Sequence, residues 1–531
     1  MEIAMTNYSI PKIKLLNASR ETIEHFNPFA DIVSSARTCY SAKGIVLPQQ
    51  IESEDQLNEN NDSRFLPLIQ SLYQAGHHTT FQHSYLHFSM ENVSRNAIWS
   101  FLHSHPFYNS EQVSQRYVHV KKDQFFYPEG LSQNQLSLLE ECYENQIKDY
   151  KEYRKLTQPL VESEYLKRFK SRKGSKQAEK DIKKKGMEVA RYLLPIGTTA
   201  YLHHTVSFIT LLRYYRLCHI FDVPAEQRAL VDGMMAEVIK IDPQLPKIIE
   251  DPLPFDASPE YQFMQEFCGQ RDPHQFIKEF DNELDNKISL LIDYKVNQER
   301  TLANSIREVS GLTSQAKSDD TLIDWVLNSG SNRLLGESLN LGTHSKLMRS
   351  LLHSHYTFKK KLSHTADSQD QRHRMTPGSR PILQNHFTGN PDYITPLITK
   401  MDDKLVQFYD NSMAKSWDFV NKGLAMGMSF EQASYMLPNA LSIRFTESAD
   451  LLNLKHKMAM RLCYNAQEEI WQASLEEALQ ISEVHPKIGE HLLPPCNIRS
   501  QAKTRPICPE GPRFCGVPVW KIKRENYQRS I

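Results

Sequence analysis

Apolar residues recur at helical spacing late in the chain. They lie three or four residues apart, on one side of a helix packed against a core, at Leu451, Leu454, Met458 and Leu462. Residues 131–156 are also helical by composition, whereas residues 64–120 mix aromatic and β-branched stretches around a histidine-rich segment. Prolines interrupt the pattern from residue 242, and a helical pattern resumes before residue 300. We therefore expect a connector there and place a boundary between residues 245 and 246.

Two short patterns each occur twice, in the same order. The first pair is HSYLHF from His83 and HSHYTF from His353. The second pair is ARYLLP from Ala190 and ASYMLP from Ala433, and each runs into a long helical pattern. Two ordered motif pairs argue for an internal duplication. We predict an N-terminal copy over residues 1–245, with a helical and basic insertion at about 131–186, and a C-terminal copy over residues 246–531 with a cysteine-containing tail.

Length and charge narrow the class of protein. The 531 residues exceed the roughly 250–300 at which a single core stops growing, so at least two domains are expected. The 63 basic residues balance the 63 acidic ones, which gives no support to general binding of nucleic acid or of membrane surfaces. No apolar run approaches the roughly 20 residues that a membrane span needs, and the N-terminal segment has no secretory signal pattern. We expect a cytoplasmic protein without membrane association.

The eight cysteines are too sparse for a disulfide framework. Cys496, Cys508 and Cys515 lie in the tail near His485 and His491 and could in principle bind zinc, but no C-x-x-C pair is present. We predict no metal site and interpret Cys496 as tail structure. The basic run at 167–185 is typical of a solvated surface.

Arg372, His373 and Arg374 form a basic triplet before the turn-rich segment MTPGSRP. Guanidinium groups match the geometry of phosphate oxygens, so the triplet suits a phosphate or another anionic cofactor group. On charge pattern alone, a solvated basic triplet is the commoner interpretation.

The position of this triplet adds to its meaning. The stretch from His353 to Arg374 resembles the signature region of flavin-dependent thymidylate synthases, in which an F-E-H segment leads to R-H-R-x-x-S-x-N-x-x-S-x-R-Y. Gln369 stands three residues before the triplet, as a glutamine does in that family. The end of the motif is altered, and only Ser379 and Arg380 echo the S-x-R-Y, at shortened spacing.

The first copy resembles the opposite end of the same signature. Residues 104–117, SHPFYNSEQVSQRY, fit the motif without gaps and keep Ser114, Arg116 and Tyr117, but Ser104 and Pro106 replace the two opening arginines. This alignment needs a two-residue insertion upstream.

The downstream motifs are complementary in the same way. The family has an arginine just before L-P and another in the following helix. The first copy keeps the former as Arg191, where the second has Ser434. The second keeps the latter as Arg461, where the first has Cys218. Each copy has therefore retained what the other has lost.

The resemblance implies an α+β fold, a sheet with long flanking helices. Two fused copies would form a pseudo-dimer, which would pair with a second chain as a homodimer that acts as a pseudo-tetramer. Family active sites lie between subunits, so this chain would keep one composite site. The implied ligands are FAD, the nucleotide dUMP, and NADPH and methylenetetrahydrofolate as co-substrates, and the implied reaction is reductive methylation of dUMP to dTMP.

The resemblance also assigns residues to the site. Arg461 would be the catalytic residue, facing the uracil ring and stabilising negative charge that develops there. The dUMP-binding residues would be Gln112, Ser114, Gln115, Arg116, Arg191, Gln369, Arg372 and Arg461. The flavin would be held by Thr79, Arg372, His373, Arg374 and His456. One alternative is a non-catalytic nucleotide- or flavin-binding descendant, because both copies lack the asparagine and glutamate of the signature. The other is a nucleic-acid-binding scaffold that uses the basic run, although nucleic acid is not an expected partner.

Overall fold

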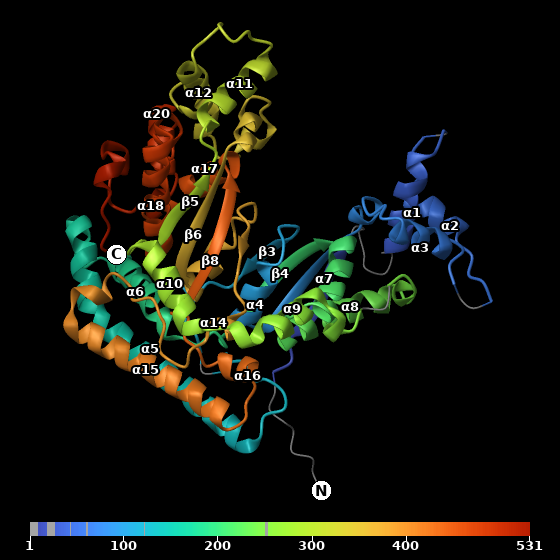
Figure 1. Cartoon of the computed structure of the whole chain (residues 1–531), viewed down its shortest axis with the longest axis horizontal. Coiled ribbons are helices and arrows are strands. Elements are labelled where there is room, and N and C mark those ends of the chain that lie inside the picture. The colour runs from blue at the N-terminus through green and yellow to red at the C-terminus, as the bar shows by residue number, and fades with distance from the viewer. Residues whose placement is uncertain (1–8, 19–26, 43, 60–61, 122, 250–252) are drawn as a thin grey trace.

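The computed structural model describes residues 9–18, 27–42, 44–59, 62–121, 123–249 and 253–531. These form two four-stranded antiparallel sheets with long helices packed around them (Figure 1). The expected mixture of sheets and long helices is therefore confirmed. Among the described residues, no helix is both long and apolar enough to cross a bilayer.

The two sheets have the same strand order. The first runs β1-β2-β4-β3, with β1 at Lys12–Ala18, β2 at Tyr85–Ser94, β3 at Asn109–Gln112 and β4 at Thr199–Ser207. The second runs β5-β6-β8-β7, with β5 at Ser289–Tyr294, β6 at His355–Ser363, β7 at Gly378–Ser379 and β8 at Ser442–Asp450. The chain thus builds one arrangement twice.

Most helices have a counterpart in the other half. The first half contains α1 (Pro28–Cys39), α2 (Pro48–Glu54), α3 (Leu66–Gln74), α4 (Arg95–Leu102), α5 (Gln133–Arg168), α6 (Lys176–Ala190), α7 (Phe208–Ile220) and α8 (Ala225–Ile241). The connector contains α9 (Pro259–Phe267) and α10 (Pro273–Leu284), and the expected boundary at 245/246 falls just before it. The second half contains α11 (Gln298–Ser310), α12 (Asp319–Leu327), α13 (His364–Asp370), α14 (Leu383–His386), α15 (Asp403–Ala425), α16 (Phe430–Ser434), α17 (Leu451–Arg461) and α18 (Glu468–Val484). Helices α19 (Pro486–Gly489) and α20 (Pro495–Gln501) lead into the tail. Within the described ranges, α3 and α14 each occur in one half only.

The same local chemistry starts the helix after the second strand of each sheet. Ser94 caps α4 by accepting a hydrogen bond from the backbone N–H of Ala97, and Ser363 caps α13 in the same way. The backbone N–H and the hydroxyl of Ser94 both donate to Glu226 of α8. Those of Ser363 both donate to Glu469 of α18. A buried carboxylate therefore locks each cap to the helix that follows the sheet.

Contacts between the halves are reciprocal. The N–H of Ile196 donates to the carbonyl of Leu437 at 2.8 Å, and that of Asn439 donates to the carbonyl of Leu194 at 2.7 Å. Pro195 and Pro438 lie opposite each other as an isolated β-bridge. Such exchange of equivalent partners is the pattern of an isologous two-fold interface.

Two tyrosines of the repeated L-P motifs make the same exchange. The Tyr192 hydroxyl donates to Glu469 at 2.7 Å, and the Tyr435 hydroxyl donates to Glu226 at 3.0 Å. Each half thus contributes a buried donor to the capping carboxylate of the other.

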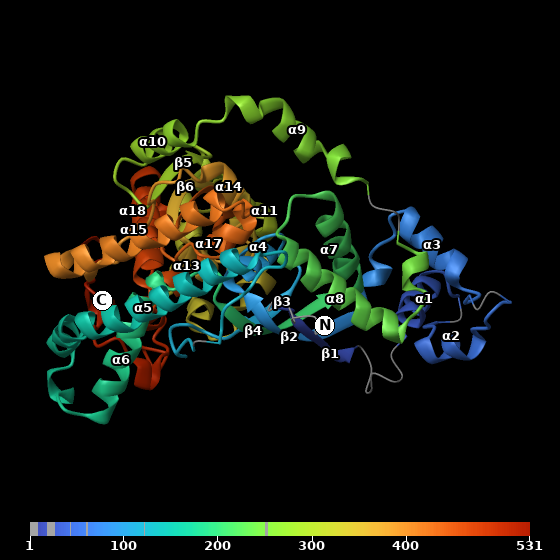
Figure 2. The same ribbon diagram turned by 90° about the horizontal axis from the view of Figure 1, so that it is seen from below.

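The long helices give the two halves a shared core. Helices α5 and α15 lie side by side (Figure 2), below the sheets in the view of Figure 1, and Gln146 of α5 donates to Ser416 of α15 at 3.1 Å. Both helices connect the third and fourth strands of their sheets. The predicted insertion at 131–186 therefore has a counterpart in the second half. The predicted stripe, Leu451, Leu454, Met458 and Leu462, is fully buried.

The strand register shows that Ser379 and Arg380 do not correspond to the S-x-R-Y end of the motif. Ser379 lies opposite Thr446 on β8, whereas Glu111 lies opposite His203 on β4. These are equivalent positions in the two sheets, so Ser379 corresponds to Glu111 rather than to Ser114. The interpretation of Ser379 and Arg380 as a shortened S-x-R-Y is therefore wrong.

Candidate active site

The second half supplies its part of the site at the ends of two helices. Gln369 is near the end of α13, the basic triplet follows at once, and Arg461 is the last residue of α17. Arg461 is buried, its Nη2 donates to the Gln369 carbonyl at 2.7 Å, and its Nε lies 3.4 Å from Asp370 Oδ1. Burial lowers the pKa of Arg461, against the attraction of Asp370. The guanidinium is therefore anchored through its own half.

The first half supplies Gln112 to Arg116, which run from the end of β3 into a turn, and Arg191, which follows α6. Arg95, at the start of α4, donates to Gln112 Oε1 and to the Val113 carbonyl, both at 2.6 Å, and so holds this turn in place. Burial, and then the charge of Arg191, lower the pKa of Arg95 to about 10.

The two sets of residues meet. Arg116 Nη2 donates across the halves to the Asn465 carbonyl at 2.9 Å, four residues beyond Arg461. Gln115 Oε1 accepts from Asn439 Nδ2 at 3.2 Å, and the same amide donates to the Arg191 carbonyl. The charges of Arg372 and Arg116 both act to lower the pKa of Arg461. One chain thus brings together the arginines that the sequence divides between its halves.

The buried carboxylate of Glu188 lies within this cationic cluster. Glu188 pairs with Arg116 and with Lys185, whose Nζ is 3.0 Å from Glu188 Oε1. Although burial acts to raise it, the pKa of Glu188 is lowered by Arg116, Lys185, Arg191 and Arg529. Burial lowers the pKa of Lys185 to about 8. Two more buried carboxyl groups lie near the same cations, because Glu468 acts on Arg529 and Glu469 acts on Arg191. Four cations thus face three carboxyl groups.

Some of that charge has no hydrogen-bond acceptor. Arg191 is 5% exposed, and its Nε and Nη2 have no partner among the described residues. Nη1 and Nη2 of Arg529 are also buried and have no hydrogen-bond partner among the described residues. Burial lowers the pKa of both arginines. A buried guanidinium without an acceptor is costly, so the donor set fits a ligand that brings anionic oxygens.

Sequence reasoning missed Arg95, Lys185 and Arg529. Lys185 was assigned to a basic run interpreted as a solvated surface, and Arg529 is an isolated charge in the tail, more than 300 residues from Glu188. No spacing signal marks either one, because Arg529 comes near Glu188 only when the end of the chain bonds to α5 through Ser530 and Ile531.

The proposed flavin residues divide into two groups. His373 and His456 face each other with ring centroids 6.0 Å apart, and Arg374 reaches the Pro106 carbonyl at 3.3 Å. Arg372 is largely exposed and pairs with Glu111 at 3.0 Å. These four lie at one edge of the site. Thr79 is exposed and precedes a short helix that packs on α1 and α7 of the first half, so this contact does not bring it to the triplet.

A mirror position exists between the halves. There, Ser434 occupies the place of Arg191 and Ile382 that of Ser114, beside a cavity of about 360 Å³. Cys218 is buried in the apolar core at the place of Arg461. Asp222 and Glu431 line this cavity, and burial raises the pKa of both carboxyl groups. The mirror position therefore has no arginine at the places of Arg191 and Arg461, and Arg380, which also lines the cavity, is paired with Asp367 at 2.7 Å.

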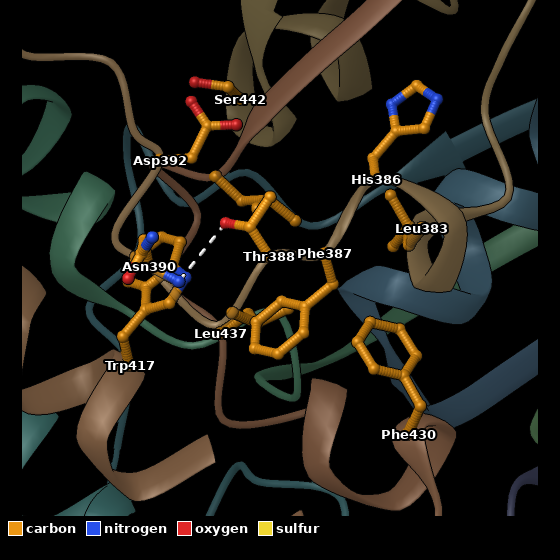
Figure 3. A pocket seen from close by; sticks show the side chains of 11 residues that line it. Leu383, His386, Phe387, Thr388, Asn390, Asp392, Trp417, Phe430, Leu437 and Ser442 are labelled. Carbon is orange, nitrogen blue, oxygen red and sulfur yellow. Dashed lines mark hydrogen bonds between the residues drawn. The ribbon is translucent and has the colours of Figure 1, made fainter. Parts of the chain in front are cut away.

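Two smaller cavities carry no comparable chemistry. The first, of about 20 Å³, is lined largely by apolar groups such as Trp417 and Phe430 (Figure 3), room for a single water molecule. The second, also about 20 Å³, is lined by Cys463, Cys496, Cys508 and Cys515. All four thiols are free, and within the described residues no group of three or more ligands is arranged to hold a metal.

Known proteins match both halves. The family model described as thymidylate synthase complementing protein matches residues 21–244 and 290–487. A flavin-dependent thymidylate synthase from Clostridium tetani is 29% identical over 236 residues, covering 44% of this chain and 84% of the relative. Those from Pyrococcus abyssi and Geobacter sulfurreducens are 28% and 27% identical over 190 and 216 residues. They cover 34% and 40% of this chain and 75% and 88% of their own length. Each relative is thus matched over most of its own length by less than half of this chain.

Proposed function

Since this chain belongs to the family of thymidylate synthase complementing proteins, we propose that it is a flavin-dependent thymidylate synthase whose two halves share one composite active site. The observation that carries the proposal is Arg191, a buried guanidinium with two nitrogens that have no acceptor among the described residues. It lies near Arg116, whose charge also acts on Arg461 of the other half. A nucleotide monophosphate carries close to two negative charges at neutral pH and would satisfy those donors.

The proposal assigns each end of the nucleotide to one half. Arg116, Arg191 and Ser114 would bind the phosphate of dUMP, together with Gln112 and Gln115 beside them. Gln369 would contact the pyrimidine or sugar, since its Oε1 is buried without a partner. Arg461 would stabilise charge that develops on the uracil ring.

FAD would be held at the open edge by Arg372, His373, Arg374 and His456, a donor set that suits its phosphates. When bound, FAD would pass a hydride from NADPH to the substrate. The balanced reaction converts dUMP, methylenetetrahydrofolate, NADPH and a proton to dTMP, tetrahydrofolate and NADP⁺. The cytoplasmic location expected from the sequence belongs to this proposal.

We also propose that the two halves are fused copies of one family fold, paired as a pseudo-dimer. Identical strand orders, identical helix caps and reciprocal contacts support this. A second chain would complete a homodimer and bring its own Thr79 to the flavin. Among the described residues, the outer face of the first sheet is exposed at Tyr201, which is 52% exposed. The equivalent face of the second sheet is covered by α10.

The test is the absorption spectrum of the purified protein after addition of FAD and desalting, followed by titration with dUMP and an assay of dTMP formation. Retained flavin, a spectrum that dUMP perturbs, and dTMP that requires methylenetetrahydrofolate and NADPH would support the proposal. A folded protein that retains flavin but forms no dTMP would be a non-catalytic descendant. A folded, colourless protein that does not bind dUMP would reject both the active enzyme and the non-catalytic descendant.

A further inference from the structure

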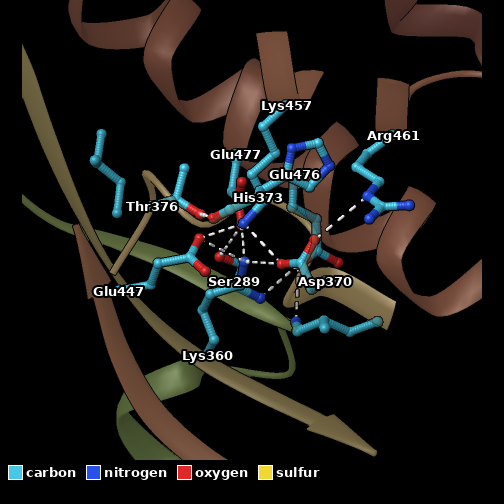
Figure 4. A network of polar contacts seen from close by, with 12 residues as sticks. Ser289, Lys360, Asp370, His373, Thr376, Glu447, Lys457, Arg461, Glu476 and Glu477 are labelled. Atoms are coloured by element: carbon cyan, nitrogen blue, oxygen red, sulfur yellow. Dashed lines mark hydrogen bonds and ion pairs between the residues drawn. The ribbon is translucent and has the colours of Figure 1, made fainter. Parts of the chain in front are cut away.

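Behind Arg461 lies a network of buried charges that the proposed reaction does not use directly (Figure 4). It consists of two lysines and three carboxylates, each at most 2% exposed: Lys360 on β6, Asp370 on α13, Glu447 on β8, Lys457 on α17 and Glu477 on α18. Lys360 Nζ lies 2.8 Å from Glu477 and 3.1 Å from Glu447, and Lys457 Nζ lies 2.7 Å from Asp370. Each of these five elements contributes one charge.

The charges of the network balance only with Arg461. Two lysines face three carboxylates, and Arg461 supplies the missing cation through Asp370. Arg380 touches the edge of the network, 3.8 Å from Glu447, but brings its own counter-ion, Asp367, at 2.7 Å. Despite its burial, the pKa of Asp370 is well below its usual range because of Lys457, Lys360 and Arg461. Asp370 is therefore a buried anion that links Arg461 to the rest of the network.

The first half of the chain shows what the same scaffold contains without Arg461. Strand register and helix position pair the five network residues with Met90, Phe101, His204, Tyr214 and Met234, all at most 1% exposed. His204 Nε2 contacts the Tyr214 hydroxyl at 3.0 Å, and the Phe101 ring packs on both. Burial lowers the pKa of His204 to about 3, so this set is uncharged.

The comparison separates folding from function. The fold forms around neutral packing in the first half, and buried ion networks are often no more stabilising than apolar groups of similar size. The five charges are therefore not needed for the scaffold. They occur in the half that keeps Arg461 and are all missing from the half that has Cys218 instead.

We propose that Asp370, held by Lys457 behind it, is a positioning residue that fixes the Arg461 guanidinium in the site. The inference rests on the proposed function, because Arg461 acts there on the substrate. Lys457 ties Asp370 to β8 through Glu447, and Lys360 ties it to α18 through Glu477. The position of the Arg461 guanidinium is thus fixed by contacts that lead to α13, β8 and α18, and not by its own flexible side chain alone.

The test compares Asp370→Asn with the wild type in steady-state turnover of dUMP. Misplacement of a group by about 1 Å costs on the order of 100-fold, so kcat should fall roughly 10- to 100-fold. The KM for dUMP should change by less than about threefold, since the phosphate contacts lie in the other half. In an Arg461→Met background, Asp370→Asn should add less than about twofold, because the residue it positions is gone.

Two variants separate positioning from stability. Arg444, on the opposite face of β8 from the network, forms an ion pair with Asp392. The control variant Asp392→Asn removes that carboxylate and should leave kcat within about twofold of the wild type. The double variant Asp370→Asn/Lys457→Met restores charge balance, so it should regain thermal stability without regaining turnover. If Asp370→Asn alone does not fold, the turnover of this double variant tests the positioning role instead.

Each result decides between interpretations. An Asp370→Asn enzyme with unchanged kcat overturns the inference, and so does a double variant whose turnover returns together with its stability. A wild type that forms no dTMP and whose flavin spectrum ignores dUMP rejects the proposed function and this inference with it. If the wild type is active and Asp370→Asn has the same kcat, only the positioning role of Asp370 is rejected.

Discussion

Replacement of Arg191 by methionine should change stability and ligand binding in opposite directions. The guanidinium is buried, two of its nitrogens have no acceptor, and Arg116 adds repulsion. Glu188 and Glu469 attract it, but Glu188 is already paired with Arg116 and Lys185, and Glu469 accepts hydrogen bonds from Ser363 and Tyr192. The ligand-free protein therefore holds an incompletely compensated charge that a phosphate would neutralise.

The magnitudes follow from the same contacts. Leaving a buried donor unsatisfied costs about 1–3 kcal/mol, so Arg191→Met should raise the free energy of unfolding of the ligand-free protein by about that amount. A hydrogen bond between charged partners contributes about 1.5–3 kcal/mol, so the Kd for dUMP should rise roughly 10- to 150-fold. Methionine fills much of the vacated volume, which limits any loss from a cavity.

Urea unfolding of the ligand-free protein measures the first effect, and titration of the flavin-loaded protein with dUMP measures the second. Arg216→Met, in the half without Arg461, is the matched control and should change neither by much. If Arg191→Met lowers the unfolding free energy by more than about 1 kcal/mol and leaves the Kd within threefold, Arg191 is a structural residue and the reasoning is wrong.

Three other predictions concern turnover, pH and assembly. Arg461→Met should lower kcat by about 100- to 1000-fold while Arg216→Ala stays near wild type, and equal losses would reject a composite site. Burial raises the pKa of Glu226 from 4.5 to about 7, so the folded state binds the extra proton and stability falls as pH rises through that window. Relative to wild type, Glu226→Gln should therefore gain up to about 3 kcal/mol in unfolding free energy between pH 4.5 and 7, and a flat difference in urea unfolding would contradict this. Tyr201→Glu should halve the mass measured by light scattering if the exposed sheet face joins two chains, and an unchanged mass would exclude that face.

The repeated motifs allowed the family and the class of fold to be predicted from sequence, because they mark the helix starts and strand ends that recur in each half. The approach of Arg116 to Arg461 was also predictable, since the first copy retained one end of the motifs and the second copy the other. The register of β7 was not. A strand of two residues carries no alternation, so the sequence could not place Ser379 opposite Thr446.

The buried charge network could not be predicted from the sequence, for a different reason. Lys360 sits within KKK, and Glu477 within LEEAL, both of which read as surface charge. Only the fold shows that the outer lysines of the triplet, Lys359 and Lys361, face α10 while Lys360 points the other way into the core. Burial, and not residue type, distinguishes these charges from solvated ones.

Electrostatics explains why charged residues would sort between the halves by site. A half that binds no anion gains nothing from a buried arginine and carries its desolvation cost, so a neutral residue such as Ser434 or Cys218 is the more stable choice there. Loss of the arginine then leaves its counter-ions unbalanced, which favours replacing them as a set, as Phe101 and His204 stand in place of Asp370 and Glu447. At the proposed composite site the same charges would persist, because ligand and network would compensate each other. The complementary losses are thus what two halves with one working site between them should show.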